Sequence, residues 1–361
     1  MSKIYWVWLS FVLGIMSDAT PLIERYKTAK NIYNNKDEIS KLKLISPIKI
    51  KRMHNITLEE IEKIIFLHTS KGFNLVTYED NEYPQQLKTI FKPPLVLYYK
   101  GDINICNNNL LISVVGSRNP TAYGVEAAKI ICDGLVKSNV IIVSGLASGL
   151  DSEAHKASVK ANVPTIAILG TAIDVCYPKN NYALRNLIEK NGVVISEYPI
   201  NTIGKPQYFV YRNRLIAGLC NGLCVIEAKK QSGTMSTVNF AIDYNKNIFA
   251  VPGNIFSELS EGTNQLIKQG VKPVSRAKDI LIDFGIDEKN TQVEIKSTTI
   301  KNEFTGNKKS VYEALSLTPI DIDTLCKCTK LSLQQVMSQL TLLEMEGLIK
   351  QLPGKKFVLY S

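Results

Sequence analysis

The chain has 361 residues, too many for one small domain, and this length predicts two or three domains. With 45% hydrophobic and 21% charged residues it can bury a substantial core, which excludes a globally disordered chain. The formal net charge of +10 favours a polyanionic partner such as nucleic acid, although it also fits a protein that is merely basic.

Residues 4–16 are mostly apolar, but these thirteen positions are too few to span a bilayer. One lysine precedes them and no clear signal-peptidase site follows, so a buried helix is favoured over a signal peptide. We therefore expect a cytoplasmic protein without membrane insertion. The seven scattered cysteines and three separated histidines predict reduced thiols and no metal site.

Residues 1–72 are predicted to form a small helical domain. One of its helices is expected over Leu58–His68, because Thr57 and Glu60 have the spacing of a capping box. The segment before it carries a basic flank that could contact a DNA backbone or could equally be solvated surface: Lys41, Lys43, Lys49, Lys51 and Arg52.

Residues 73–285 are predicted to form an α/β domain with an extended Rossmann-like, doubly wound sheet. Its first part, 74–101, contains Pro84, Pro93 and Pro94 and is interpreted as a strap leading into the sheet. Continuous apolar runs, typical of buried parallel strands, follow at 111–115, 140–143, 165–169, 193–196, 223–226 and 248–251.

Residues 286–309 are polar and lysine-rich and are interpreted as a linker. Residues 310–361 show three helical patterns and a hairpin signal at Pro353-Gly354, which together predict a winged helix. Its third helix lacks Lys and Arg, so the module could bind either DNA or another protein.

Three of the predicted strands end in turns made of small residues. The first turn is Gly116-Ser117-Arg118; the others contain Ser144, Gly145, Ser148 and Gly149, and Gly170. Glycine lets a ligand approach the backbone, a following helix offers free N–H groups to an anion, and an arginine fork suits phosphate. All three turns are expected at one edge of the sheet, which predicts an anion site there.

Two nucleotide cofactors are excluded by missing motifs. The glycine spacing is not that of a dinucleotide-binding fingerprint, and no acidic residue ends the second strand. No P-loop sequence is present either. We expect no cofactor.

Residues 205–214 combine cations and aromatic rings, which suits single-stranded nucleic acid because bases stack on rings and cations hold the backbone. The candidate contacts are Lys205, Phe209, Arg212, Asn213 and Arg214. The alternative is that Tyr208 and Phe209 belong to the core and that the two arginines pair with Glu227 or Asp151.

A further glycine turn, with Ser232 and Gly233, follows the strand that ends near Glu227. A lone carboxylate such as Glu227 is a weak catalytic signal. His155 is most simply a structural residue.

Several motifs together resemble the DNA-processing protein A family, also called Smf. They lie in the expected order: VVGSRNPTAYG at 114–124, SGLASGLDSEAH at 144–155, LGTAIDVCYP at 169–178, SEYP at 196–199, FVYRNRLIAGL at 209–219, VIEAKKQSGT at 225–234 and FAVPGN at 249–254. This chain has Val210 where the family usually has proline, and Ala172 in place of a glycine. Neither departure removes a charged group.

The resemblance implies a non-enzymatic protein that binds single-stranded DNA in natural transformation, protects the incoming strand and loads the RecA recombinase, usually as a homodimer. By position, Arg118 matches the family's glycine-serine-arginine turn, and Arg212, Asn213 and Arg214 match its arginine-asparagine-arginine motif. Two alternatives stay open: a nucleotide N-glycosidic hydrolase that uses Glu227, and a transcription factor that acts through the winged helix.

Overall fold

The computed structural model describes residues 2–286, 306–316, 319–346, 348–352 and 354–359. The chain divides into two compact units, one with 1–120 and 127–286 and one with 121–126 and 287–361. The helical segment and the large sheet therefore belong to the same unit.

A nine-stranded sheet forms the centre of the first unit, with the order β1-β2-β6-β5-β4-β3-β7-β8-β9. All pairs from β6 to β9 are parallel, whereas β1 and β2 are antiparallel additions at one edge. The strands are β1 (Asn74–Thr77), β2 (Val96–Gly101), β3 (Leu111–Val115), β4 (Ile141–Ser144), β5 (Thr165–Leu169), β6 (Val193–Ser196), β7 (Gly222–Val225), β8 (Asn247–Ala250) and β9 (Lys272–Pro273).

Helices cover both faces of this sheet, as the doubly wound prediction requires. On β5, Ile166 and Ile168 pack in the cluster that contains helix α10, whereas Ala167 and Leu169 pack in the cluster that contains helix α9. The helices that come after β3 in the chain are α7 (Ala122–Lys137), α8 (Leu150–Lys160), α9 (Tyr182–Asn191), α10 (Pro206–Leu219), α11 (Gly233–Asp243), α12 (Glu261–Lys268) and α13 (Ala277–Leu281). Short 3-10 turns cover Gln85–Lys88, Ile103–Cys106, Lys179–Asn181, Glu258–Ser260 and Ile282–Phe284.

The predicted strap is part of the sheet. Strands β1 and β2 pair with each other, and β2 continues onto β6. The prolines at 84, 93 and 94 lie in the connection between the two strands, so they interrupt the apolar pattern without entering the ladder. Interpreting this segment only as a strap was therefore incomplete.

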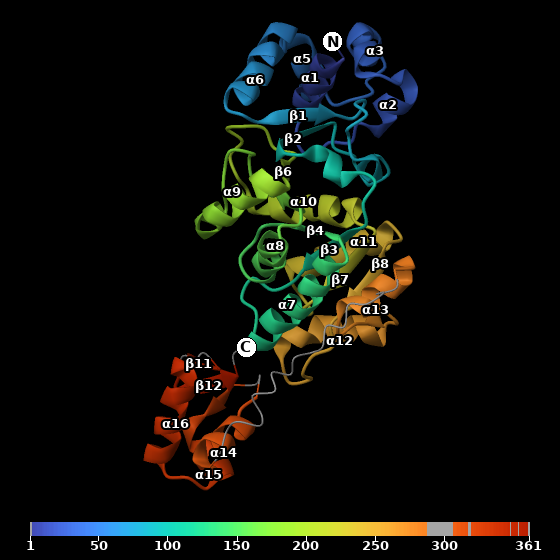
Figure 1. Cartoon of the computed structure of the whole chain (residues 1–361). Helices are drawn as coiled ribbons and strands as arrows, with labels where there is room; N and C mark the ends of the chain where they lie inside the picture. The colour runs from blue at the N-terminus through green and yellow to red at the C-terminus, as the bar shows by residue number, and fades with distance from the viewer. Residues whose placement is uncertain (1, 287–305, 317–318, 347, 353, 360–361) are drawn as a thin grey trace. The chain divides into compact units, whose positions relative to one another are not determined.

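The amino-terminal helices gather beside β1 and β2 (Figure 1). They are α1 (Lys3–Leu13), α2 (Thr20–Tyr26), α3 (Ala29–Asn34), α4 (Lys36–Lys41), α5 (Pro47–Asn55) and α6 (Leu58–Ser70). The buried helix predicted for the start of the chain is confirmed, because Trp6, Val7, Trp8 and Leu9 of α1 are almost fully buried. The capping box of Thr57 and Glu60 is also confirmed.

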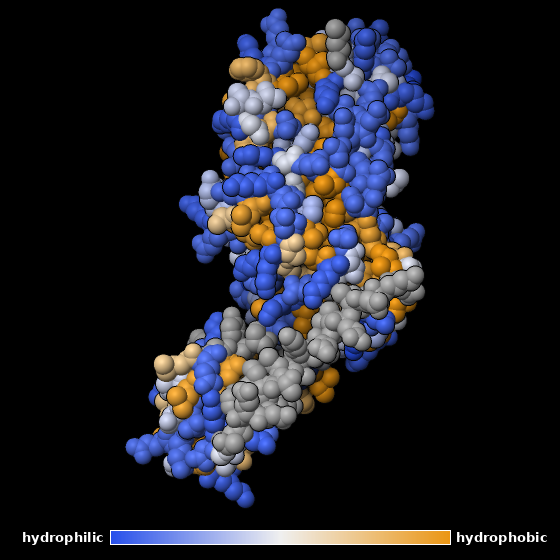
Figure 2. Space-filling view, viewed as in Figure 1, coloured by the Kyte–Doolittle hydropathy of each residue, from blue (hydrophilic) through white to orange (hydrophobic). Residues whose placement is uncertain are grey.

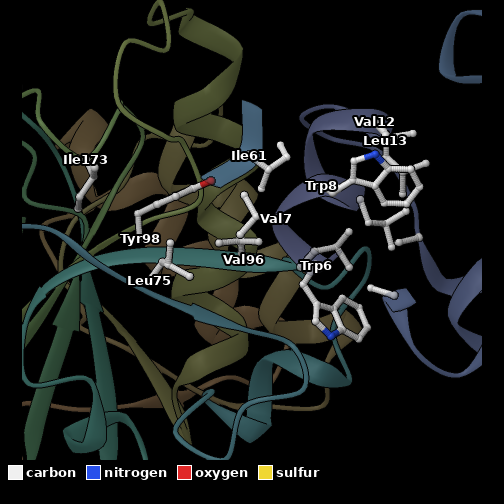
Figure 3. Close-up of a cluster of buried hydrophobic side chains, with 14 of the residues drawn as sticks. Trp6, Val7, Trp8, Val12, Leu13, Ile61, Leu75, Val96, Tyr98 and Ile173 are labelled. Carbon is white, nitrogen blue, oxygen red and sulfur yellow. The ribbon is translucent and has the colours of Figure 1, made fainter. Parts of the chain in front are cut away.

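One hydrophobic cluster joins these helices to the sheet. Trp6, Val7 and Ile61 pack there with Leu75 of β1 and with Val96 and Tyr98 of β2 (Figure 3). The His68 ring stacks on Tyr98 and accepts a hydrogen bond from the Ile200 N–H at 3.0 Å. The helical segment is thus held against the sheet by shared core packing.

The face of the protein drawn in Figure 2 is mostly hydrophilic, with smaller apolar areas between the polar side chains. Within the described part of the chain, no helix is both long enough and apolar enough to cross a membrane.

The second unit contains the predicted winged helix. Its described elements are α14 (Gly306–Ala314), β10 (Ile320–Asp321), α15 (Ile322–Thr329), α16 (Leu333–Met345), β11 (Ile349–Leu352) and β12 (Lys356–Leu359). The hairpin formed by β11 and β12 was predicted, whereas the short strand β10 was not. Most of the predicted linker lies outside the described residues, and α14 begins inside its last part.

Candidate nucleic-acid interface

A cavity of about 420 Å³ lies where β3, β4 and β7 end. Its walls come from the turns after these strands and from one side of α10. Eight predicted site residues line it: Gly116, Ser117, Arg118, Phe209, Arg212, Asn213, Ser232 and Gly233. The prediction that the turns converge at one edge of the sheet agrees with this geometry.

Arg118 is an exposed cation of the cavity; the other, Lys229, pairs with Glu258 at 2.6 Å. The Arg118 guanidinium carbon lies 5.6 Å from the centre of the Phe209 ring, a distance at which a cation and a ring attract each other. Gly116, two residues earlier, has no space for a side chain, because a Cβ there would meet Leu150 at 2.3 Å. A guanidinium and a ring held together in this way can contact a phosphate and a base of one strand.

The amino terminus of α11 forms another wall. Ser232 precedes the helix in extended conformation, and its hydroxyl makes no hydrogen bond in the described part of the chain. Free N–H groups and an unused hydroxyl at a helix start favour an anion. Asn213 braces this turn, since its amide donates to the Gly233 carbonyl and to the Ser236 hydroxyl.

Arg212 of α10 also lines this cavity, although it is only 3% exposed. Its Nη1 donates to the Gly145 carbonyl at 2.9 Å and also to the Ile168 carbonyl. Burial lowers the pKa of Arg212 to about 10, although the neighbouring Asp151 opposes this change, so the side chain stays charged at neutral pH. The guanidinium therefore ties together the chain segments at the ends of β4 and β5.

Asp151 is the counter-charge of this arrangement. Its carboxylate accepts hydrogen bonds from the N–H groups of Gly145 and Ala147, at 3.1 and 3.3 Å. Burial raises the pKa of Asp151, while Arg212 and the two N–H groups act in the opposite direction. Asp151 thus fixes the turn after β4 to the first turn of α8.

Arg214 does not lie in the cavity. It is fully buried, and its Nη2 donates to both carboxylate oxygens of Glu197 at 2.6 and 2.7 Å. Its guanidinium carbon also lies 4.1 Å from the centre of the Tyr211 ring. The expected strand contact by Arg214 is contradicted by this burial, because no part of the side chain is open to a ligand. The partner is Glu197, and neither Glu227 nor Asp151.

The remaining small residues support the site from behind. The Ser144 hydroxyl is buried and donates to the Val114 carbonyl, and a Cβ on Gly145 would lie 2.6 Å from the Arg212 guanidinium. Gly149 has φ +77° and packs on the Ser117 and Arg118 carbonyls, a conformation that favours glycine. Gly170 leaves room for Phe209, because a Cβ there would lie 2.7 Å from the Phe209 ring. Ser144, Gly145, Gly149 and Gly170 therefore shape the site and do not line it; Ser148 is exposed and does not line it either.

Two other residues considered from the sequence lie outside this cavity. Lys205 is exposed and lines a different cavity, on the other side of the first turn of α10. Glu227 is 1% exposed and does not line the cavity, an arrangement that does not favour its use as a general base for a bound nucleotide. Among the described residues, no group of three or more His, Cys, Asp or Glu side chains is placed to hold a metal ion.

Sequence reasoning missed several residues that line the site, and two of them carry polar groups beside Ser232. Lys229 and Thr234 line the cavity beside Ser232, and the Thr234 hydroxyl donates to the Gly116 carbonyl at 3.2 Å. Both belong to the turn after β7, in the quoted motif at 225–234, so their position after a buried strand was an available signal.

Comparison with known proteins identifies the family. The family model described as DNA recombination-mediator protein A matches residues 74–285, and the DprA winged helix domain matches residues 301–355. The chain belongs to the DNA recombination-mediator protein A family. The match at 74–285 covers the sheet and every residue of the cavity.

Relatives in this family align over most of the chain. The DNA processing protein DprA of Bacillus subtilis is 35% identical over 233 residues, which cover 64% of this chain and 78% of that protein. The protein Smf of Synechocystis sp. is 30% identical over 355 residues, and this alignment covers 86% of this chain and 89% of that protein.

Two solved structures of the family share the fold. DNA processing protein A from Streptococcus pneumoniae superimposes with a TM-score of 0.61 at 35% identity, over 66% of this chain and 82% of that one. The protein from Helicobacter pylori, studied for its single-stranded DNA binding mode, gives a TM-score of 0.54 at 29% identity, over 59% and 96% of the two chains.

Proposed function

We propose that this protein binds single-stranded DNA at the cavity formed by the turns after β3, β4 and β7. The observation that carries the proposal is the exposed Arg118 guanidinium over the Phe209 ring, beside the amino terminus of α11. A cation, a ring and free helix N–H groups are the elements that hold a backbone and stack a base. The net charge of +10 supports a polyanionic ligand as well.

Membership of the family supports a proposal about the biological role. We propose that the chain acts in natural transformation without catalysing a reaction, protects incoming strands and loads the RecA recombinase, as a homodimer in the cytoplasm. We also propose a division into a helical domain at 1–72, a Rossmann-like domain at 73–285, a linker at 286–309 and a winged helix at 310–361, with the first two packed together in one compact unit. The burial of Glu227 supports a binding protein over a nucleotide hydrolase.

The first test measures the affinity of the full chain for a single-stranded oligonucleotide as a function of salt. We expect Arg118→Ala to weaken binding about tenfold and to reduce the slope of log K against log salt by about 0.7, the value for one lost phosphate contact. The control is Lys137→Ala, which removes one exposed charge from α7 outside the cavity.

The two variants separate a specific site from general attraction. Equal affinities and equal salt slopes for Arg118→Ala and Lys137→Ala would show that the strand binds elsewhere. A wild-type protein without measurable affinity for any oligonucleotide would contradict the proposed function itself.

A further inference from the structure

A second cavity, of about 520 Å³, lies between the amino-terminal helices and the sheet. One wall comes from the end of α1, the turn after it, and Arg52 of α5. The opposite wall comes from the chain after β6 and from the first turn of α10. The polar residues of the lining are Ser10, Ser17, Arg52, Tyr98, Glu197, Thr202, Lys205, Gln207 and Tyr208.

Two cations at this cavity have no assigned partner. Neither the Arg52 side chain nor the Lys205 side chain makes a hydrogen bond or an ion pair with any described residue, and both residues are exposed. Arg52 lies against the backbone of Gly14, where a Cβ would be 3.0 Å from Nη1. The end of α1 therefore places the guanidinium, since a helix carboxyl terminus attracts a cation, and leaves its N–H groups unused.

The start of α10 adds a backbone donor on the opposite wall. Lys205 is the residue before this fourteen-residue helix, and no side chain of the described residues caps it. Pro206 has no N–H, and the Tyr208 N–H donates to the Lys205 carbonyl at 3.0 Å. The Gln207 N–H is therefore the donor that this first turn offers to an anion. Two cations and an uncapped helix start thus face one cavity.

The floor of the cavity holds an unused buried hydroxyl. Tyr98 is 2% exposed, and its hydroxyl lacks a hydrogen bond of ordinary geometry within the described part of the chain. Burial raises the pKa of Tyr98, although the nearby Ser10 side chain acts to lower it. A buried polar group without a partner is costly unless a ligand or water supplies the bond. Glu197 also lines the cavity, but Arg214 occupies both of its oxygens, so the charge left for a ligand is positive.

We propose that this second cavity binds a phosphate-bearing nucleotide unit, with the phosphate at Arg52, Lys205 and the start of α10. The unit belongs to the same strand that fills the Arg118 cavity, so the inference rests on the proposed function. Tyr208 lines one cavity and Phe209 the other, and Lys205 and Phe209 are about 6 Å apart along the helix axis. A strand that crosses the first turn of α10 reaches both.

This path gives the amino-terminal domain a role in binding. Of its basic flank, Arg52 lines the cavity, whereas Lys51, its neighbour on α5, does not. The two residues are both exposed and both carry one charge, so they form a matched pair for mutation.

The experiment compares Arg52→Ala and Lys51→Ala in the full chain, with a short oligonucleotide of about six nucleotides and a long one of about twenty. We expect Arg52→Ala to weaken binding of the long strand several-fold and to reduce its salt slope by about 0.7. We expect the same variant to weaken binding of the short strand as well, because six nucleotides, at about 3.4 Å each, are longer than the distance of about 6 Å between Lys205 and Phe209. Lys51→Ala changes neither.

A second readout tests the buried hydroxyl. Tyr98→Phe removes one oxygen and keeps the ring, and we expect it to weaken the long strand without altering the salt slope. If Arg52→Ala and Lys51→Ala bind the long strand equally, the inference is wrong while the Arg118 site stands. If Arg118→Ala also has no effect on either length, the proposed function fails instead.

A free nucleotide is the other source of such a phosphate, and deoxythymidine monophosphate is the probe for it. We expect no measurable binding of this mononucleotide at concentrations where the long strand saturates the protein. If it binds in a manner that depends on Arg52 while the long strand does not, the cavity serves a free nucleotide and the strand path is overturned.

Discussion

Arg118 and Arg214 belong to two regions that treat the same side chain in opposite ways. The turn after β3 leaves Arg118 exposed beside an aromatic ring, with its charge available to a ligand. Arg214 of helix α10 is completely buried, and its guanidinium forms an ion pair with the Glu197 carboxylate. Arg212, two residues before it on the same helix, lies between these extremes, because it lines the cavity but donates to carbonyls.

The difference teaches that an arginine in a motif associated with nucleic-acid binding need not be open to any ligand. An exposed guanidinium keeps its contact with water and therefore needs no ion-pair partner. When it binds a phosphate, salt ions are released, so its contribution to affinity depends on the salt concentration. A buried one must be paired, and it then holds the surrounding chain in position. The variants below distinguish these roles by measuring stability and salt dependence together.

The largest effect is expected for the buried ion pair. Arg214→Met leaves the Glu197 carboxylate without its partner, and we expect a loss of about 3–5 kcal/mol in the free energy of unfolding, measured with urea. The control is Arg25→Met, because Arg25 and Glu38 form a pair in which both side chains are about half exposed, and the loss of such an exposed pair should change stability little.

A double variant strengthens this test. Glu197→Gln combined with Arg214→Met removes the unpaired charge and should recover part of the lost stability. If Arg214→Met destabilises the protein no more than Arg25→Met does, the buried pair is not a structural element and the comparison with Arg118 fails.

Much of this fold was predictable from the sequence, and the reason is burial on both faces. Strands β3, β5 and β6 were predicted with their observed limits, because parallel strands covered by helices are unbroken apolar runs. β1 and β2 were missed because three prolines lie in the segment between them and because β1, at the edge of the sheet, has only four residues. A short edge strand carries little of the hydrophobic pattern on which such predictions depend.

The site was predictable in position but not in the roles of its arginines. The turns after strands identified Arg118, Ser232 and Gly233 correctly as cavity residues. Arg212 and Arg214 are two residues apart on a helix, which separates them by about 200° around the axis, so both could not face one strand. Recognising 206–219 as a helix would have revealed this; the partner Glu197 comes from a distant segment that no local pattern indicates.

An intermediate effect is expected for Arg212. Arg212→Met removes the bonds to the Gly145 and Ile168 carbonyls and leaves Asp151 without its cation, so we expect a loss of about 2–3 kcal/mol in unfolding free energy. Strand affinity should fall as well, because the turn after β4 loses its support. The slope of affinity against salt should stay at the wild-type value, since no phosphate contact is lost.

This outcome contrasts directly with that of Arg118→Ala, which should alter the salt slope and leave the unfolding free energy nearly unchanged. If Arg212→Met reduces the salt slope by about 0.7, Arg212 itself contacts a phosphate and is not a positioning residue.

The smallest effect is expected for His155, whose protonation would place a second positive charge in the interior beside Arg212. His155 is fully buried, its Nδ1 lies 2.8 Å from the Thr165 hydroxyl, and its Nε2 has no partner within the described residues. Burial, helped by the charge of Arg212, lowers the pKa of His155 to about 3. His155 in the folded protein therefore stays neutral at pH values where the same histidine in the unfolded chain is protonated, because the ordinary pKa is about 6.5.

The sign follows from this difference. The contribution of His155 to stability is complete above about pH 6.5 and is lost as the pH falls from there towards 3, by up to about 1.4 kcal/mol per pH unit. We expect His155→Gln to remove this slope between about pH 6 and 5, as measured by urea unfolding at each pH, with His54→Gln as the exposed control. Equal slopes for His155→Gln and the wild type would mean that the interior around Arg212 admits a proton, and that its guanidinium is less isolated from water than its burial indicates.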